Sequence, residues 1–134
     1  MPTPHLFNVQ VYYEDTDHSG VVYHANYLKY FERSREHLLG IPELVQLYTT
    51  DGIGFVVYKA DLTYRKGAEF GDTLQIQTSI EMESTFRLIF HQTAVLASTQ
   101  QILVEGHIEL VCVDRQRKLI KLPTIVLDKL KQYL

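Results

Sequence analysis

Hydrophobic and polar residues alternate near the start of the chain, over residues 6–13. Phe7, Val9, Val11 and Tyr13 fall on one face of this segment, and polar residues occupy positions 8 and 10 between them. A period of two is typical of a β-strand that buries one face. We therefore predict a strand over residues 6–13.

Residues 25–39 replace this alternation with a helical spacing. Their stripe consists of Leu28, Phe31, Arg35 and Leu38, with Tyr27, Ser34 and Leu39 beside it. Gly40 and Pro42 follow, where glycine supplies a left-handed cap and proline prevents the helix from continuing. The pattern predicts a long helix over residues 25–39, and residues 43–48 are expected to form a short second helix.

Four later segments return to the strand period, at residues 56–64, 74–82, 86–96 and 102–112. Polar turns separate them, and residues 74–82 give the cleanest alternation of a half-buried strand. Residues 124–134 are expected to form a short C-terminal helix with Thr124 as its N-cap.

One long helix that covers one face of a five-stranded antiparallel sheet accounts for this order of elements. The predicted fold class is therefore α+β, in a single domain over residues 1–134. The other face of the sheet is less polar than a solvated face, because it carries Ile89, Val95, Leu103, Val111 and Val113. We expect that face to be buried against another subunit, which makes the protein a homodimer or homotetramer.

Composition excludes several classes of function. The chain has 134 residues, 46% of them hydrophobic, and a net charge of −3. It therefore has no global basic field for nucleic-acid binding. No apolar run approaches the roughly 18 residues of a membrane span. The single cysteine, Cys112, cannot form an internal disulfide, and we expect a cytoplasmic location.

Residues 12–27 concentrate the chemistry of the chain, because three acids, two histidines and four tyrosines surround one glycine between the first strand and the helix. Asp15 and Asp17 are candidates for a general base or a nucleophile, and equally for turn residues that accept backbone hydrogen bonds. The imidazole of His24 has two readings as well, because it either polarises a carbonyl or packs as a core residue. Its backbone N–H lies where a helix begins and favours negative charge.

Other catalytic arrangements find no support in the sequence. His18, His24 and the two aspartates are metal-ligand types, but their spacing matches no metal signature, so no metal is expected. The glycines are scattered and form no phosphate loop, and no Gly-x-Ser-x-Gly elbow is present. Cys112 lies in the middle of a predicted strand, which argues against a cysteine nucleophile.

The stretch Tyr-Tyr-Glu-Asp-Thr-Asp-x-x-Gly-Val-Val-Tyr-His-x-Asn-Tyr at residues 12–27, followed by Phe31-Glu32-Arg33 and Arg35, resembles a known signature. It is similar to that of hotdog-fold acyl-CoA thioesterases, closest to the 4-hydroxybenzoyl-CoA thioesterase family and its Tol–Pal-associated (YbgC-type) branch. The resemblance covers nearly the whole chain. It implies a hotdog fold, in which a curved antiparallel sheet wraps a long central helix.

The resemblance also implies roles for individual residues. The catalytic carboxylate of the family falls on Asp17, and the backbone amide that stabilises the oxyanion falls on His24. In the Tol–Pal-associated branch Tyr13 and the ring of His24 are implicated as well, as groups that position the carboxylate or the water. Glu14, Asp15 and His18 are assigned structural roles, as is Glu32, which lies too far along the helix to reach the same cleft.

Substrate contacts are expected from Asn26, Arg65 and Lys66, although a capping role for Asn26 is equally consistent with the sequence. Lys59 and Arg87 are further candidates for the phosphates of coenzyme A. The implied function is hydrolysis of an acyl-CoA or acyl-carrier-protein thioester to a carboxylic acid and a free thiol, without a cofactor. Two alternatives stay open: hydration of an enoyl thioester, and non-catalytic binding of an acyl thioester or acyl carrier protein.

Overall fold

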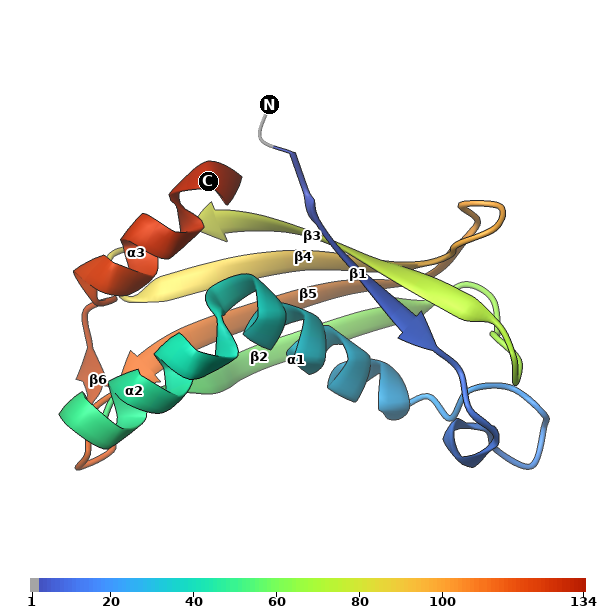
Figure 1. Ribbon diagram of the computed structural model, residues 1–134, viewed down its shortest axis with the longest axis horizontal. Helices are drawn as coiled ribbons and strands as arrows, with labels where there is room; N and C mark the ends of the chain where they lie inside the picture. The colour runs from blue at the N-terminus through green and yellow to red at the C-terminus, as the bar shows by residue number, and fades with distance from the viewer. Residues whose placement is uncertain (1–2) are drawn as a thin grey trace.

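One antiparallel sheet and a helix laid across it form the body of the molecule (Figure 1). The computed structural model describes residues 3–134, so the first two residues of the predicted domain lie outside it. The strands are β1 (His5–Gln10), β2 (Gly54–Tyr64), β3 (Thr73–Met82), β4 (Arg87–Leu96), β5 (Ile102–Val113) and β6 (Leu119–Ile120). The helices are α1 (Asn26–Leu39), α2 (Ile41–Asp51) and α3 (Thr124–Leu130), with short 3₁₀ turns η1 (Tyr13–Asp15) and η2 (Lys131–Tyr133).

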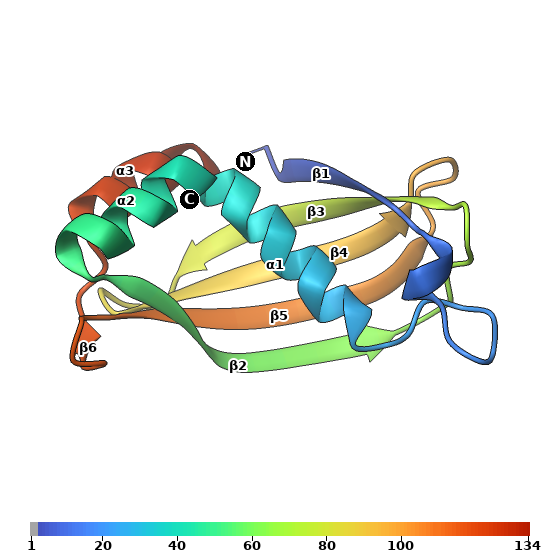
Figure 2. The ribbon, with the colours of Figure 1, turned by 60° about the horizontal axis from the view of Figure 1, so that its bottom comes forward.

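The strands are ordered β1-β3-β4-β5-β2, and β6 pairs with the end of β5. β1 and β2 therefore form opposite edges of the sheet, although they are separated in sequence only by η1, α1 and α2. Figure 2 shows α1 crossing one face of the sheet diagonally, with α2 and α3 together at one end of the molecule. This arrangement confirms the predicted α+β class.

Helix and sheet approach each other closely at Gly106, in the middle of β5. A Cβ atom at Gly106 would lie 2.6 Å from Cε2 of Phe31, so only glycine leaves room for the ring. Phe31 is fully buried there, on the same face of α1 as Tyr27, Tyr30 and Leu38. The central position of α1 therefore depends on a missing side chain in the sheet.

The buried stripe of α1 differs from the predicted one at one end. Leu28 is 43% exposed, whereas Tyr30, which was not expected in the core, is buried. Tyr27 and Phe31 set the centre of the stripe, and Leu28 lies roughly 100° from Tyr27 around the helix axis, at the margin of the contact.

Local hydrogen bonds explain where the first strand ends. β1 stops at Gln10, and Tyr13 lies in η1 rather than on the strand face predicted for it. The carboxylate of Asp15 accepts a 2.9 Å hydrogen bond from the backbone N–H of Tyr12, and the carbonyl of Tyr13 accepts 2.7 Å and 3.0 Å bonds from Thr16. These bonds offer the backbone an alternative to the sheet, as Asp and Thr often do.

The other helices also differ in detail from expectation. α2 begins at Ile41 directly after Gly40, whose φ is 100°, and it is longer than the short helix predicted. Thr124 is the first helical residue of α3, and Pro123 takes the N-cap position assigned to Thr124. Pro123 has the extended backbone typical of a residue that precedes a helix.

Part of the apolar surface expected to meet a second subunit is buried within the chain itself. Ile89, Val95 and Leu103 are already buried within the chain. Leu103 is the unpaired residue of a bulge, since Ala94 pairs with Val104 and Val95 with Ile102. Bulges shift the alternation of faces, which the sequence pattern does not show.

Exposed apolar side chains collect instead on β2. Val56, Val57, Tyr58 and Tyr64 are between 45% and 61% exposed on this edge strand. In the order of the sheet β2 has only β5 as a neighbour, so its other edge carries unpaired backbone groups.

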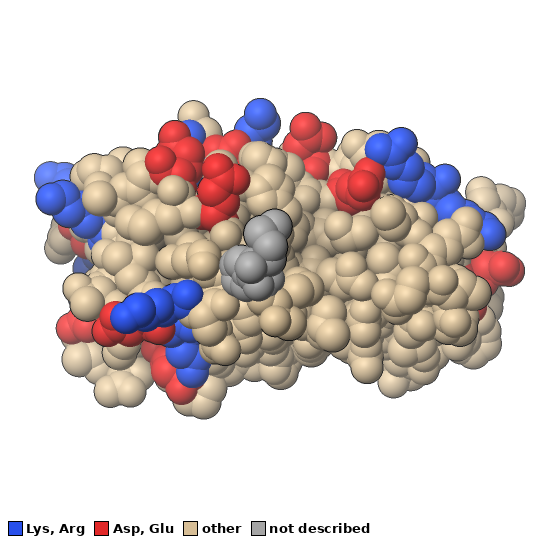
Figure 3. All heavy atoms as spheres, turned by 90° about the horizontal axis from the view of Figure 1, so that it is seen from above, with Lys and Arg blue, Asp and Glu red and all other residues tan. Residues whose placement is uncertain are grey.

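Charged side chains are distributed in small groups. On the face in Figure 3, Lys and Arg lie in separate groups near the margins, with Asp and Glu among them. Over the part of the chain that the structure describes, no helix is long and apolar enough to cross a membrane.

Candidate active site

Asp17 lies in a tight turn between η1 and α1. Its backbone N–H bonds to Val21 O at 2.8 Å, and its carbonyl accepts from Gly20 N at 3.0 Å. Gly20 closes the turn with a φ of 83°, a region that favours glycine. The loop is therefore fixed by its own backbone, which holds the aspartate in one place.

The two carboxylate oxygens of Asp17 have different surroundings. Oδ1 accepts a 2.8 Å hydrogen bond from the backbone N–H of Ser19, which is the Asx turn that the sequence allowed for. Within residues 3–134 no hydrogen bond reaches Oδ2. The turn and a chemical role are thus compatible, because one oxygen orients the group and the other is available to a substrate or water.

His24 lies just before α1 begins at Asn26. Its carbonyl oxygen accepts hydrogen bonds from the Tyr64 hydroxyl at 3.0 Å and from Tyr27 N at 3.4 Å. In the described part of the chain, its own backbone N–H donates no hydrogen bond to another residue. That amide is an unpaired donor close to the positive end of the α1 dipole, which suits it to stabilise negative charge.

Asp17 and His24 line the same cavity, which has a volume of about 310 Å³. The loop before α1, the helix start and the end of β2 supply its walls, through Asp17, Val21, Val22, His24, Tyr27, Tyr64, Arg65, Lys66 and Gly67. Residues far apart in the sequence are thereby brought together around one carboxylate and one free amide.

Arg65 and Lys66 border this cavity as the sequence predicted, but both are engaged elsewhere. Arg65 donates from Nε and Nη2 to one oxygen of Glu105, at 3.0 Å and 2.7 Å. Lys66 Nζ donates to the side chain of Gln101 at 3.2 Å. The charge of Arg65 is therefore largely balanced by a carboxylate within its own chain.

Tyr13 and Asn26 are not brought to the cavity. Tyr13 is 77% exposed and packs edge-on against Phe70 at 6.0 Å, because η1 turns it away from the sheet. Asn26 donates its side-chain amide to the carbonyl of Asp15 at 2.9 Å, which ties the helix start to η1. This bond pins the helix start but is not a cap, because Ala25 takes the N-cap position of α1 and no side-chain hydrogen bond caps the helix.

Tyr64 and Tyr27 are the site residues that sequence reasoning missed. The Tyr64 hydroxyl is a protonated donor to His24 at neutral pH, and partial burial raises its pKa further. Burial raises the pKa of Tyr27 to about 12. In the sequence, the only indication of a site role for Tyr64 was its position at the end of the predicted strand over residues 56–64, directly before Arg65.

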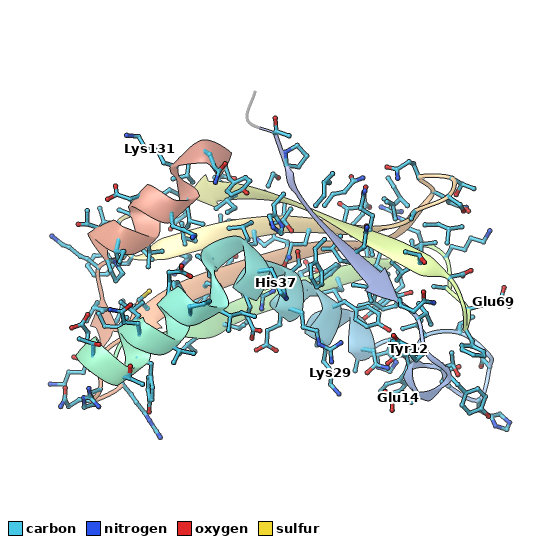
Figure 4. All side chains as sticks on the ribbon, in the orientation of Figure 1. Tyr12, Glu14, Lys29, His37, Glu69 and Lys131 are labelled. Carbon is cyan, nitrogen blue, oxygen red and sulfur yellow. The ribbon has the colours of Figure 1, made fainter. Side chains whose placement is uncertain are left out.

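Other members of the polar cluster have structural positions. Asp15 closes η1 through its hydrogen bond to Tyr12, and His18 is exposed. Figure 4 places Tyr12 and Glu14 at this turn, at the end of the molecule away from α2 and α3. His37 lies farther along α1, where its ring stacks on Phe7 at 4.8 Å.

The described residues offer neither a metal site nor a reactive cysteine. Among the residues described, no group of three or more His, Cys, Asp or Glu side chains is placed to hold a metal ion. Cys112 is buried in β5, and desolvation raises the pKa of its thiol to about 12. A thiol with such a pKa carries no thiolate at neutral pH.

Comparison with known proteins places this geometry in a family. Residues 11–130 match the model of the thioesterase-like superfamily. The chain belongs to this superfamily. A relative from Escherichia coli, the acyl-CoA thioester hydrolase YbgC, is 38% identical over 126 residues, which cover 92% of this chain and 93% of the relative.

Two solved structures share the fold of this chain. A probable thioesterase from Bartonella henselae superposes with a TM-score of 0.81 at 30% identity, covering 90% of this chain and 99% of that one. A 1,4-dihydroxy-2-naphthoyl-CoA thioesterase from Synechocystis gives a TM-score of 0.88 at 24% identity, with 96% of both chains covered. The hotdog fold and the family resemblance inferred from the sequence are confirmed.

Proposed function

We propose that this protein hydrolyses acyl-CoA thioesters to a carboxylic acid and free coenzyme A. One observation carries the proposal: Asp17, which has a carboxylate oxygen without a hydrogen bond, and His24, which has an unpaired backbone N–H, line one cavity. A base or nucleophile and an oxyanion donor are the groups that acyl transfer requires. The name of the Escherichia coli relative, an acyl-CoA thioester hydrolase, supports the same reaction.

The chemistry follows from these two groups. The free oxygen of Asp17 either removes a proton from water, which attacks the thioester carbon, or attacks that carbon itself to give an anhydride that water then opens. In both routes the C–S bond breaks and the thiolate leaves without strong acid assistance. The N–H of His24 stabilises the oxyanion in between, a contribution of about 2.7–4 kcal/mol for one donor.

The thiol released from acyl-CoA by wild type and by Asp17→Asn tests this proposal. The amide keeps a hydrogen-bond acceptor for Ser19 but can neither attack nor accept the proton, so we expect turnover to fall at least about a hundredfold. Glu14→Gln is the matched control, because it removes a neighbouring exposed carboxylate outside the cavity and should leave turnover unchanged. Equal hydrolysis by wild type and Asp17→Asn would remove Asp17 from the mechanism.

The same assay separates the alternatives. Binding of an acyl thioester by wild type without any thiol release would favour a non-catalytic binding protein. Loss of the enoyl absorbance without thiol release would favour an enoyl-thioester hydratase. A panel of acyl groups on coenzyme A and on acyl carrier protein then defines chain length and carrier.

We further propose that the protein is a homodimer joined through the free edges of two β2 strands. The unpaired backbone of β2 and the exposed side chains of Val57 and Tyr58 support this contact. Two-fold symmetry makes the paired strands antiparallel. Val57→Lys is expected to shift the mass in light scattering from dimer to monomer, and an unchanged mass would contradict this interface.

We also propose a cytoplasmic location and catalysis without a metal cofactor. The single cysteine and its burial in β5 fit a reducing compartment. Catalysis without a metal is tested by treating the protein with a chelator, which should leave the rate of hydrolysis unchanged.

A further inference from the structure

A second cavity lies between η1 and the first half of α1, and it shares no residue with the Asp17 cavity. Its volume is about 240 Å³. Every residue that lines it has a polar side chain, and these residues are Glu14, Asp15, Asn26, Lys29, Tyr30 and Arg33. The proposed hydrolysis uses none of these side chains, so the purpose of the cavity is a separate question.

The cavity is built by the fold of the chain around the carbonyl oxygen of Asp15. This oxygen accepts hydrogen bonds from the side chain of Asn26 and from the backbone N–H of Tyr23, both at 2.9 Å. The two bonds hold η1 against the start of α1. The lining residues of the helix follow one another at spacings of three and four, which places them on one face, namely Asn26, Lys29, Tyr30 and Arg33.

Tyr30 brings to this cavity a buried hydroxyl without a hydrogen-bond partner. The residue is 1% exposed, and no group within residues 3–134 forms a hydrogen bond with its hydroxyl. Burial raises the pKa of Tyr30, the charge of Asp15 raises it further, and the charge of Arg33 lowers it. Since both of these charged residues line the cavity, the hydroxyl lies at the cavity end of the ring. Buried polar groups are nearly always hydrogen-bonded, so this one indicates a polar partner from outside the chain.

The helix wall of the cavity carries two positive charges. Lys29 and Arg33 lie four residues apart on α1, a spacing at which like charges destabilise a helix. The salt bridges among the described residues involve other cations, and neither Lys29 nor Arg33 takes part in one. An anionic group between the two would relieve their repulsion, and the guanidinium of Arg33 is suited to a carboxylate, which it can bind through two parallel hydrogen bonds.

The opposite wall, formed by η1, carries two negative charges. Asp15 Oδ2 accepts a 2.9 Å hydrogen bond from the backbone of Tyr12, whereas no group in the described part of the chain donates to Oδ1. Glu14 is exposed, and none of the salt bridges within residues 3–134 includes it. Figure 4 shows Glu14 on η1 and Lys29 on α1 at the same side of the molecule. The cavity therefore has an acidic wall and a basic wall.

A ligand that fits both walls carries both charges. A simple anion would be attracted by the helix wall but repelled by the carboxylates of η1, and a simple cation would meet the reverse. A zwitterion satisfies both walls without leaving a net charge in the cavity. At about 30 Å³ for each water molecule, a volume of about 240 Å³ has room for roughly eight waters, which is enough for a small amino acid.

We propose that this cavity binds a free α-amino acid. The carboxylate of the ligand lies between Lys29 and Arg33 and accepts a hydrogen bond from the Tyr30 hydroxyl. Its ammonium group donates to Asp15 Oδ1 and to the carboxylate of Glu14. The site lies within one chain, and it depends neither on the proposed hydrolysis nor on a second subunit.

Calorimetric titration of the full chain with a panel of L-α-amino acids is the first test. We expect at least one of them to bind with one site per chain. Its N-acetyl derivative lacks the ammonium charge and its amide lacks the carboxylate, so each should bind at least about tenfold more weakly. Equal binding of the N-acetyl derivative or of inorganic phosphate would show a simple anion site and overturn the proposal, as would the absence of binding by every amino acid at millimolar concentration.

Two single variants locate the ligand in this cavity. Tyr30→Phe keeps the buried ring and removes the hydroxyl, and Arg33→Gln removes a charge from the basic wall. Each should weaken binding of the amino acid about tenfold or more, because a hydrogen bond to a charged group is lost. Tyr133→Phe and Lys131→Ala are the matched controls at the C-terminal end of the chain and should leave the affinity unchanged. Wild-type affinity in both Tyr30→Phe and Arg33→Gln would place the ligand elsewhere.

Thermal unfolding tests the same assignment without calorimetry. The amino acid should raise the Tm of wild type, because it binds only the folded chain, and should raise that of Tyr30→Phe less. Without the amino acid, Tyr30→Phe should be at least as stable as wild type, since the hydroxyl has no partner to lose. A lower Tm for Tyr30→Phe would contradict this. Amino-acid binding without thioester hydrolysis would defeat only the proposed function, and hydrolysis without amino-acid binding would defeat only this inference.

Discussion

The hydroxyl of Tyr64, the last residue of β2, donates a 3.0 Å hydrogen bond to the backbone carbonyl of His24. The two residues lie at the end of an edge strand and just before the central helix. This bond fixes the peptide unit that follows His24, and with it the approach to α1. The amide proposed to stabilise the oxyanion is therefore positioned in part by a side chain from the sheet.

Tyr64→Phe removes this hydrogen bond but keeps the aromatic ring and its packing. The net value of such a bond is about 0.5–1.5 kcal/mol, so we expect kcat for acyl-CoA hydrolysis to fall several-fold while KM changes little. Tyr133→Phe, which removes a hydroxyl at the opposite end of the chain, is the control for steady-state kinetics. A rise in KM alone would show that Tyr64 contacts the substrate rather than positions His24.

The close contact between Gly106 and Phe31 leads to a prediction about stability. Gly106→Ala places a methyl group 2.6 Å from the buried ring of Phe31 and 3.3 Å from the backbone oxygen of Gln92. We expect the free energy of unfolding to fall by about 1–3 kcal/mol, as for other overpacked cores. Gly54→Ala is the matched control, since no atom lies within 4 Å of its added Cβ. Urea denaturation of both variants measures the difference, and equal stabilities would contradict the packing argument.

The sequence could predict the fold because each element has a clear period. The alternation in β3 and the helical spacing of α1 both reflect burial on one side, and neighbouring elements agree with one another. Bulges are the exception. Leu103 lies in one and is buried within the chain, although the alternation of faces had placed it on the exposed back of the sheet.

The candidate site could be predicted only in part, and the reason is sequence separation. Asp17 and His24 belong to one short motif, so their shared cavity agrees with the expectation from the sequence. Tyr64 reaches His24 from far along the chain, and no periodicity reports such a contact. Tyr13 does not line this cavity, because the hydrogen bonds of Asp15 and Thr16 form η1 and end the strand that was expected to carry it.

Alkaline pH should destabilise the protein through groups that are buried in their neutral forms. Burial raises the pKa of Tyr27 from 10.0 to about 12 and that of Cys112 from 9.0 to about 12. Below the ordinary pKa, which is 10.0 for Tyr27 and 9.0 for Cys112, the group is neutral in both the folded and the unfolded chain, so pH does not change the stability. Between the two values the unfolded chain loses protons that the folded chain keeps, so the free energy of unfolding falls as pH rises.

Denaturation curves between pH 8 and pH 11 test this dependence. The fall begins near pH 9 and steepens above pH 10, by up to about 1 kcal/mol per pH unit for each group. Tyr27→Phe should flatten the part above pH 10, and Tyr133→Phe should not. A pH profile that Tyr27→Phe leaves unchanged would exclude Tyr27 as a source of the slope.

A buried polar chain beneath α1 gives the last prediction. Arg35, only 6% exposed, donates from Nη1 to Gln92 Oε1 at 2.9 Å, and Gln92 Nε2 donates to Thr78 Oγ1 and the carbonyl of Phe31, both at 3.1 Å. Gln92→Leu leaves the guanidinium without this acceptor, so we expect a loss of about 2–4 kcal/mol of unfolding free energy. Arg35→Met/Gln92→Leu removes both partners and should recover part of the loss, because no charge is then left unpaired. A double-mutant cycle in urea measures this coupling, and strictly additive losses would show that Arg35 does not depend on Gln92.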